Sequence, residues 1–186
     1  MKKIKFSSTG FDGLVVYERL PVSDSRGSFQ RMYCKNTLAQ IGCDKTITQI
    51  NHSFSKERGV IRGLHYQEPP FSETKIISCL AGAVYDVAVD LRAGSSTFLQ
   101  YYGIELNADK PMSIVIPEGF AHGFQTLTSD CQLLYLHTAD YAPDAERGFN
   151  MFDETIGIEW PLKATQISER DKVLPMIIDD FPGVKL

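Results

Sequence analysis

Hydrophobic and polar residues alternate along several short stretches of the chain, which is the pattern of β-strands with one buried face. In residues 83–91 one face carries Tyr, Val, Val and Leu, and the other carries Val, Asp, Ala and Asp. Residues 131–138 alternate again, with Tyr135 and His137 on the face opposite to two leucines. Turn residues separate the other expected strands, at 48–55, 60–67, 74–82, 101–108 and 112–116.

Helical signals in the chain are few and short. A turn or two of helix is expected at 36–42, capped by Asn36 and closed by Gly42, and another after Ser168. Many closely spaced strands with little helix predict an antiparallel sandwich or barrel. The turn-rich last stretch, residues 158–186, is expected to wrap around the sheets, which predicts a single domain over residues 1–186.

The composition is that of a globular protein of ordinary domain size, with 186 residues of which 43% are hydrophobic and 23% charged. The net charge of −4 is spread along the chain, and no basic stripe indicates nucleic-acid binding. Apolar runs are too short to span a bilayer, and the lysines at the start precede no apolar signal-peptide region. We therefore expect a cytoplasmic protein without membrane or nucleic-acid partners, whose four separated cysteines stay reduced.

The stretch VIRGLHYQ, residues 60–67, holds the first candidate for chemistry. The strand period places Arg62 and His65 on opposite faces, but Gly63 between them favours a β-bulge that would turn both side chains into one cavity. Taken alone, the segment fits a half-exposed histidine on an edge strand equally well. Lys75 opens the next expected strand and, considered by itself, would be a solvated lysine.

Residues 116–124, IPEGFAHGF, match the P-x-G-x-x-H pattern of cupins, in which a sharp turn presents a histidine, here His122, to the inside of a barrel. Metal-binding cupins carry further ligands upstream, in a G…H-x-H…E segment. Here Gln67 stands where a second histidine would be, and Glu73 comes too early for the carboxylate. Since zinc, iron and manganese sites need three or more such ligands, we expect no bound metal.

Two further candidates have ordinary structural explanations. Tyr135 lies on the polar face of its strand, followed by Tyr141 and Glu146, but a lone tyrosine usually packs on a sheet. Asp171 follows Ser168 by three residues, and this spacing is that of a helix capping box. The local sequence favours the capping role over a catalytic aspartate.

Considered together, these segments resemble the dTDP-4-dehydrorhamnose 3,5-epimerases, and the likeness covers about residues 12 to 176. The combination of RGLHYQ with IPEGFAHGF is highly specific for this family among the cupins. The segments that occur in the family's order are 26–29, 49–55, 59–67, 84–92, 116–124, 139–148, 156–161 and 167–175.

The resemblance implies an all-β fold, a double-stranded β-helix or jelly roll with a few short helices. It also implies an enzyme that inverts C3, C5 or both in a dTDP-linked 4-keto-6-deoxyhexose, through an enolate and without a cofactor. A homodimer is expected by the same analogy, since pairing would cover an exposed strand edge.

The resemblance also assigns roles to residues. His65 is the implied base, Asp171 its partner, Tyr135 the acid that returns a proton on the opposite face, and Lys75 the stabiliser of the enolate. Arginines suit a diphosphate because of their forked donors, and Tyr141 aligns with an aromatic residue that stacks on thymine. Contacts to the sugar nucleotide are implied for Arg26, Arg31, Gln49, Asn51, Arg62, His122, Tyr141, Glu146 and Arg170.

The chain departs from the family pattern at four places. Arg31 stands where a glutamate is frequent, Leu136 where a lysine usually follows the catalytic tyrosine, and Arg170 where lysine is commoner. Residues 151–153 replace the usual WND. None of these changes removes an implied catalytic group, but they leave open the sugar, the nucleotide and the number of centres inverted, so a mono-epimerase would look similar.

Three other functions are open from the residues. A metal-dependent cupin enzyme would use His65 and His122 as ligands and would need stoichiometric metal for activity. A sugar-nucleotide-binding protein without catalysis has no need for the acid and base that Tyr135 and His65 would provide. A 3,4-ketoisomerase is a related cupin activity, but such proteins usually lack the C-terminal segment that carries Asp171.

Overall fold

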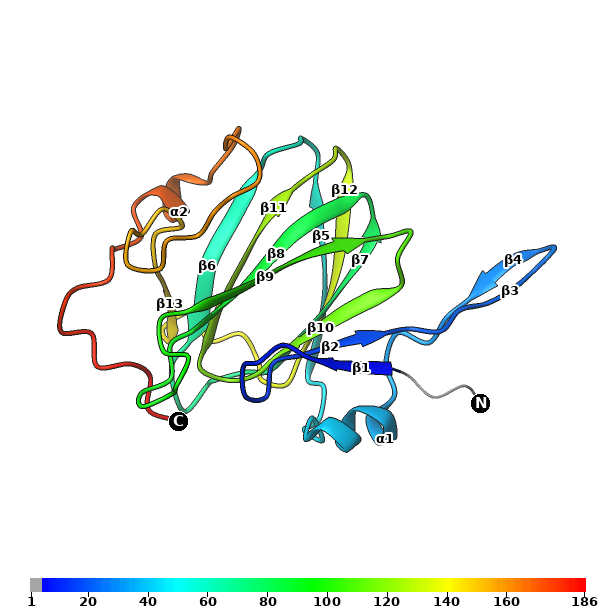
Figure 1. Cartoon of the computed structure of the whole chain (residues 1–186), viewed down its shortest axis with the longest axis horizontal. Helices are drawn as coiled ribbons and strands as arrows, with labels where there is room; N and C mark the ends of the chain where they lie inside the picture. Colours follow the sequence, from blue (N-terminus) through cyan, green and yellow to red (C-terminus); the bar gives the residue numbers. More distant parts are fainter. Residues whose placement is uncertain (1–4) are drawn as a thin grey trace.

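The computed structural model describes residues 5–186 and is built on two antiparallel sheets with a small separate hairpin (Figure 1). The larger sheet has the strand order β1 (Lys5–Ser8), β2 (Val15–Glu18), β10 (Met112–Ile116), β7 (Lys75–Ala81), β12 (Cys131–His137) and β5 (Gln49–Ser55). The second sheet has the order β13 (Glu146–Gly148), β6 (Ile61–Gln67), β11 (Phe120–Thr126), β8 (Ala83–Asp90) and β9 (Tyr101–Asn107). The hairpin of β3 (Val22–Asp24) and β4 (Gly27–Phe29) projects from the body of the barrel (Figure 1).

The two sheets stack as a jelly roll, the fold that the family resemblance implies, and each expected strand is present within one residue of its predicted bounds. The sequence did not predict β1, β2, β3, β4, β11 or β13, and β11 was missed because its sequence does not alternate. All seven of its residues are buried, since it lies between β6 and β8 and is covered on both faces. Within residues 5–186 no helix is long and apolar enough to cross a membrane.

The two expected helical turns are present, but one begins differently from the prediction. The helix α1 (Lys35–Leu38) continues into the 3-10 turn η1 (Ala39–Ile41) and ends at Gly42, whose φ is +78°. The predicted cap at Asn36 is wrong, because the helix begins earlier and Cys34 occupies the N-cap without a side-chain hydrogen bond. In α2 (Glu169–Lys172) the predicted cap is confirmed, since Ser168 Oγ accepts a hydrogen bond from Asp171 N at 3.0 Å.

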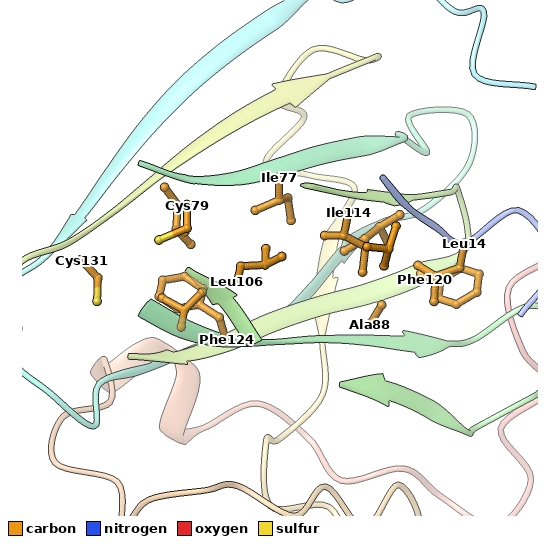
Figure 2. Packing of buried hydrophobic residues seen from close by; sticks show 13 residues of the cluster. Leu14, Ile77, Cys79, Ala88, Leu106, Ile114, Phe120, Phe124 and Cys131 are labelled. Carbon is orange, nitrogen blue, oxygen red and sulfur yellow. The ribbon is translucent and has the colours of Figure 1, made fainter. Parts of the chain in front are cut away.

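The main core lies between the sheets, where buried apolar side chains from both of them meet (Figure 2). Their removal from water is the main favourable contribution to folding. The alternation in β8 explains how that strand takes part, because Val84 and Ala88 point into this core. The labelled members of the cluster are Leu14, Ile77, Cys79, Ala88, Leu106, Ile114, Phe120, Phe124 and Cys131.

The opposite face of β8 is covered by the C-terminal part of the chain. Val87, Val89 and Leu91 pack in a second cluster with residues from the 156–184 stretch, which explains why β8 is buried on both faces. The C-terminal partners in this cluster are Ile156, Ile158, Trp160, Ile177, Phe181 and Val184. The segment that carries α2 is therefore held against the barrel on both sides of that helix.

A β-bulge interrupts the pairing of β6 with β11, as the glycine in VIRGLHYQ predicted. His65 pairs with His122, whereas Arg62 pairs with Phe124, so β6 has one residue more than β11 in this interval. Gly63 has a φ of +107°, and a Cβ atom there would lie 2.6 Å from the carbonyl oxygen of His122. The bulge therefore requires glycine at this position.

The buried carboxylate of Asp90 organises the loop between β8 and β9. It accepts hydrogen bonds from Arg92 Nε at 2.9 Å and from the hydroxyls of Ser95 and Thr97, each at 2.6 Å. Burial alone would raise the pKa of Asp90, but these hydrogen bonds outweigh burial and lower the pKa to about 2.

We expect Asp90→Asn to lower the free energy of unfolding at pH 7 by about 2 kcal/mol, because the charge-assisted bonds are lost. The folded-state pKa lies below the ordinary 3.8, so this contribution is complete above about pH 4 and declines as the pH falls toward 2. Urea unfolding at pH 7 and pH 3 gives the free energy of unfolding of both proteins at each pH. From pH 7 to pH 3 that free energy should fall less in Asp90→Asn than in the unaltered protein. Equal losses in the two proteins would contradict the assignment.

Gly63→Ala should destabilise the protein by roughly 2–3 kcal/mol, because the new Cβ atom collides with β11 and the residue keeps an unfavourable φ. Gly27→Ala is the matched control, since Gly27 has a φ of +128° but nothing lies within 4 Å of the place that a Cβ atom would take there. Thermal unfolding should rank Gly63→Ala clearly below Gly27→Ala. Equal melting temperatures would show that the bulge tolerates a side chain.

Candidate active site

A cavity of about 1160 Å³ is lined by residues of both sheets and of the segment that carries α2. Most of the residues that line it are polar or charged, whereas the core between the same sheets is built from apolar side chains. The residues that line it come from strands β5, β6, β7, β11, β12 and β13, from residues 164–172, and from Val60, Glu73 and Tyr141 in the connecting segments.

The larger sheet contributes two adjacent rows of side chains to the cavity. Gln49, His137 and Lys75 are cross-strand neighbours on β5, β12 and β7. Asn51 on β5 and Tyr135 on β12 form the next cross-strand pair on this face, two residues from Gln49 and His137 along their strands. Because residues two apart share a face of a strand, all five side chains border the cavity.

The second sheet contributes His65, His122 and Arg62. The two histidines are cross-strand neighbours on β6 and β11, and the bulge at Gly63 returns Arg62 to the same cavity. Arg62 Nη2 donates to the carbonyl oxygen of Phe54 at 3.0 Å, which links β6 to β5 across the gap between the sheets.

The most direct catalytic geometry is the pair of His65 and Asp171. His65 Nε2 lies 2.8 Å from Asp171 Oδ1, and Oδ2 accepts from Gly63 N at 3.2 Å. Burial raises the pKa of Asp171, but the hydrogen bond and charge of His65 and the Gly63 N–H outweigh it, and the pKa is lowered. An ionised Asp171 holds the proton on Nε2 and leaves Nδ1 of His65 with the lone pair of a base.

The capping role of Ser168 and the pairing of Asp171 are compatible, although the sequence presented them as alternatives. Ser168 Oγ binds the backbone N–H of Asp171, and the carboxylate of the same residue binds His65. The cap therefore fixes the turn that presents the carboxylate.

Tyr135 borders the cavity from β12 with a phenol that stays protonated near neutral pH. Burial is the main cause that raises its pKa well above the usual value, the charge of Asp86 adds to it, and Arg62 opposes it. Its ring meets His122 edge-on and lies nearly parallel to His137, with centroids 5.9 Å away in both cases. The phenol thus keeps a proton that it can donate, and its ring is held by aromatic neighbours.

His122 is fixed by a second histidine–carboxylate pair. Its Nε2 lies 2.9 Å from Asp86 Oδ2, and both side chains are buried. Asp86 reaches it from the inward face of β8, the face that the alternation assigned to this residue.

The ammonium group of Lys75 lies close to the backbone of His65 and to the carboxylate of Glu73. Its Nζ is 3.2 Å from the carbonyl oxygen of His65 and 3.3 Å from Glu73 Oε1. Glu73 Oε2 is in turn 2.7 Å from His137 Nδ1. Sequence reasoning did not select Glu73 or His137 as site residues, although the alternation had placed His137 on the same face as Tyr135.

At the rim of the cavity, the carboxylate of Glu146 binds two side chains from other segments. Its Oε2 accepts a hydrogen bond from the Tyr141 hydroxyl and pairs with Arg170 Nη2, each at 2.6 Å. Gln49 Oε1 accepts from Tyr141 N at 3.1 Å, so the rim joins β5, β13 and α2.

The structure brings all the residues implied by the family resemblance to this cavity except Arg26 and Arg31. Arg26 lies in the turn of the β3–β4 hairpin, with its side chain 88% exposed and paired with Asp24. Arg31 follows the same hairpin, and neither arginine lines the cavity of its own chain. The hairpin projects away from the barrel, which is the physical reason (Figure 1).

Most departures from the family pattern lie away from the cavity. Leu136 is buried on the opposite face of β12 from Tyr135. Met151 O accepts from Trp160 Nε1, and Asp153 Oδ2 accepts from Ile177 N, so residues 151–153 hold the C-terminal segment. Of the departures, Arg170 alone lines the cavity.

No group of three or more His, Cys, Asp or Glu residues within 5–186 is arranged to hold a metal ion. The histidines of the cavity are instead held in pairs with carboxylates, as described for His65, His122 and His137.

Residues 8–179 match the family described as dTDP-4-dehydrorhamnose 3,5-epimerase. The protein of that name from Salmonella typhimurium is 40% identical over 171 residues, which are 91% of this chain and 93% of the relative. The crystal structure of the Bacillus anthracis protein, with TDP and PPi bound, has 38% identity and a TM-score of 0.91, covering 94% of this chain and 99% of that one.

The Legionella pneumophila dTDP-6-deoxy-D-glucose-3,5-epimerase, in complex with dTDP-4-keto-L-rhamnose, has 35% identity and a TM-score of 0.91 over 98% of both chains. Sequence and fold therefore agree over nearly the whole length, and the chain belongs to the dTDP-4-dehydrorhamnose 3,5-epimerase family.

Proposed function

We propose that this chain inverts C3 and C5 of dTDP-4-dehydro-6-deoxyglucose and so forms dTDP-4-dehydro-L-rhamnose. The observation that carries the proposal is one cavity, in a member of this family, that holds a carboxylate-paired histidine, a lysine and a protonated tyrosine. These are the base, the cation and the acid that inversion next to a ketone requires.

His65 is the base in this proposal. Its Nδ1 takes the proton from the carbon beside the ketone, and the electron pair of the C–H bond moves into the enolate. Asp171 holds the ring by Nε2 and stabilises the imidazolium that forms. General base catalysis of this type contributes about 10²–10⁴-fold to the rate.

Lys75 stabilises the enolate oxygen. The ammonium is largely buried, with 10% of its side chain exposed, and it lies beside the backbone of the base. A fixed cation in a poorly hydrated site interacts more strongly with developing negative charge than it would in water.

Tyr135 returns a proton to the same carbon from the other side. His65 belongs to β6 of one sheet and Tyr135 to β12 of the other, so a sugar ring between the sheets would present one face to each group. The high pKa of Tyr135 keeps the phenol protonated until the enolate forms. After the inversion the phenolate takes up a proton from solvent and the imidazolium of His65 releases one, so both groups are restored.

The remaining polar residues suit the nucleotide and the sugar hydroxyls. Arg62 and Arg170 offer forked donors to a diphosphate, and the exposed ring of Tyr141 is available for stacking on thymine. Gln49, Asn51, His122 and Glu146 also line the cavity and provide hydrogen-bonding groups for the substrate.

The test is turnover of dTDP-4-dehydro-6-deoxyglucose in D₂O, followed by NMR. We expect deuterium at C3 and C5, no exchange in His65→Asn, and a loss of about 10²–10⁴-fold in Asp171→Asn. Tyr135→Phe should exchange without inverting, because His65 can return a deuteron only to the face from which it took the proton.

His52→Asn is the control, since His52 is an exposed histidine of β5 that bonds Gln132 and does not line the cavity. Its exchange should equal that of the unaltered protein. Exchange at a single carbon would identify a mono-epimerase, and absence of exchange at both would contradict the proposed reaction.

We also infer a homodimer in which the β3–β4 hairpin reaches the partner's cavity. Val22 and Phe29 on the hairpin are 72% and 74% exposed, which is unusual for large apolar side chains in water. The edge strand β5 exposes Ile50 and Phe54 as well, and pairing of copies would cover both features. Arg26 and Arg31 would then act on a neighbouring site.

Sedimentation should give a dimer, and Phe29→Asp should shift it toward monomer because a charge would be buried in the interface. Arg26→Ala should stay dimeric and raise KM about tenfold by loss of a charged contact. Mixing Arg26→Ala with His65→Asn should restore the low KM, since one site of each hybrid has both groups. A fully active monomer would contradict this arrangement.

A further inference from the structure

The cavity contains a third histidine–carboxylate pair, His137 with Glu73, that the proposed reaction leaves without a role. Its 2.7 Å separation is as short as that of His65 with Asp171. Both side chains are nearly buried, with 12% exposed for His137 and 10% for Glu73. Burying the two polar side chains of such a pair costs free energy, because both lose contact with water. This cost suggests that the pair has a role beyond packing.

Glu73 is shared between His137 and Lys75. Oε2 meets His137 Nδ1 at 2.7 Å, whereas Oε1 is 3.3 Å from Lys75 Nζ. The carboxylate is therefore engaged more closely by the imidazole than by the ammonium. Lys75 Nζ also donates to the carbonyl oxygen of His65 at 3.2 Å, so a continuous polar chain joins His137 to the backbone of the base.

We propose that His137 is a positioning residue that holds Glu73 away from a close ion pair with Lys75 and keeps the ammonium directed at the substrate's ketone oxygen. The inference rests on the proposed function, in which Lys75 stabilises the enolate. His137 acts in it through Glu73 and not by contact with the reacting atoms.

The physical reason is competition for one carboxylate. A carboxylate in a poorly hydrated cavity needs donors, and it closes on the nearest cation when one donor is lost. A lysine in a close ion pair with a carboxylate has much of its charge neutralised and stabilises an enolate less well. A second donor on Glu73 therefore preserves the electrostatic effect of Lys75.

The ionisation of Glu73 agrees with this sharing. Burial alone would raise the pKa of Glu73, but the hydrogen bond from His137 and the charge of Lys75 outweigh it, and the pKa is lowered. The carboxylate is thus charged at neutral pH and competes for both donors.

The backbone fixes the geometry of this group. His137 and Lys75 are direct cross-strand neighbours on β12 and β7, and Glu73 precedes Lys75 by two residues in the adjoining loop. Tyr135 lies nearly parallel to the His137 ring, at an interplanar angle of 13°, and Asn51 Nδ2 lies 3.4 Å from His137 Nε2. The ring is therefore restrained with Nδ1 toward Glu73.

The experiment compares His137→Phe, Glu73→Gln and the double variant in the D₂O assay. Phenylalanine keeps an aromatic ring beside Tyr135 but cannot donate to Glu73, so kcat should fall about tenfold to a hundredfold with KM nearly unchanged. Glu73→Gln should stay within about threefold of the unaltered protein, and adding it to His137→Phe should restore kcat to that level. His137→Asn, whose amide can replace the Nδ1 donor, is the conservative control and should retain most of the activity.

The recovery of kcat in the double variant is the decisive readout. If His137 had only a structural role, removing the charge of Glu73 would not restore the activity that His137→Phe loses. The inference is overturned if His137→Phe keeps its kcat, if only KM rises, or if the double variant is as slow as His137→Phe. A rise in KM alone would show that His137 contacts the substrate directly.

A crystal structure of His137→Phe separates this inference from the proposed function. A Glu73 oxygen should close to about 2.8 Å from Lys75 Nζ, which is the distance of a direct charged hydrogen bond. An unmoved carboxylate would overturn the inference whatever the substrate is. Absence of exchange in the unaltered protein, with the closure still observed, would overturn the proposed reaction and leave the competition for Glu73 established.

Discussion

The hydrogen bond between His65 and Asp171 joins two parts of the chain that are 106 residues apart, and the organisation of the cavity depends on it. Asp171 is buried, so its charge needs partners, and it finds them in the imidazole of His65 and in the N–H of Gly63. Those partners exist because β6 bulges at Gly63. The residues on either side of α2 pack on the barrel and bring the carboxylate to this place.

The cavity as a whole follows one rule, which is that each buried charge has an opposite or polar neighbour. Carboxylates face the three histidines, and Glu73 also faces Lys75. Desolvated groups of one sign would otherwise shift their protonation states or destabilise the fold. Groups for acid, base and electrostatic roles can therefore coexist within one small volume, each fixed by a neighbour that does not itself react.

Strands such as β8 and β12 could be predicted from the sequence because two kinds of residue alternate along them. Strand β11 could not, since its sequence does not alternate, and the cap at Asn36 failed because helix boundaries depend on backbone geometry. The bulge at Gly63 was predictable from a glycine between two functional side chains. The roles of His65 and Asp171 came from family resemblance, since no local pattern connects residues so far apart.

Other parts of the site lay beyond sequence reasoning for identifiable reasons. Alternation gave the face of His137 but not its partner, because Glu73 lies in a loop with no periodicity. Arg26 and Arg31 were expected at the cavity, but Arg26 lies in the turn of the β3–β4 hairpin and Arg31 follows that hairpin, and neither lines the cavity of the same chain. A sequence pattern can predict a hairpin but not the direction in which it projects.

The covering of β8 by residues 156–184 has a consequence for the making of the protein. Synthesis proceeds from the N-terminus, so every strand of both sheets has been made before Asp171 is added. A nascent or clipped chain that ends before residue 171 contains every strand but lacks the carboxylate that pairs with His65. The order of synthesis thus places the last strand of the sheets before the residue that completes the His65–Asp171 pair, and the same C-terminal segment that covers β8 also delivers that carboxylate.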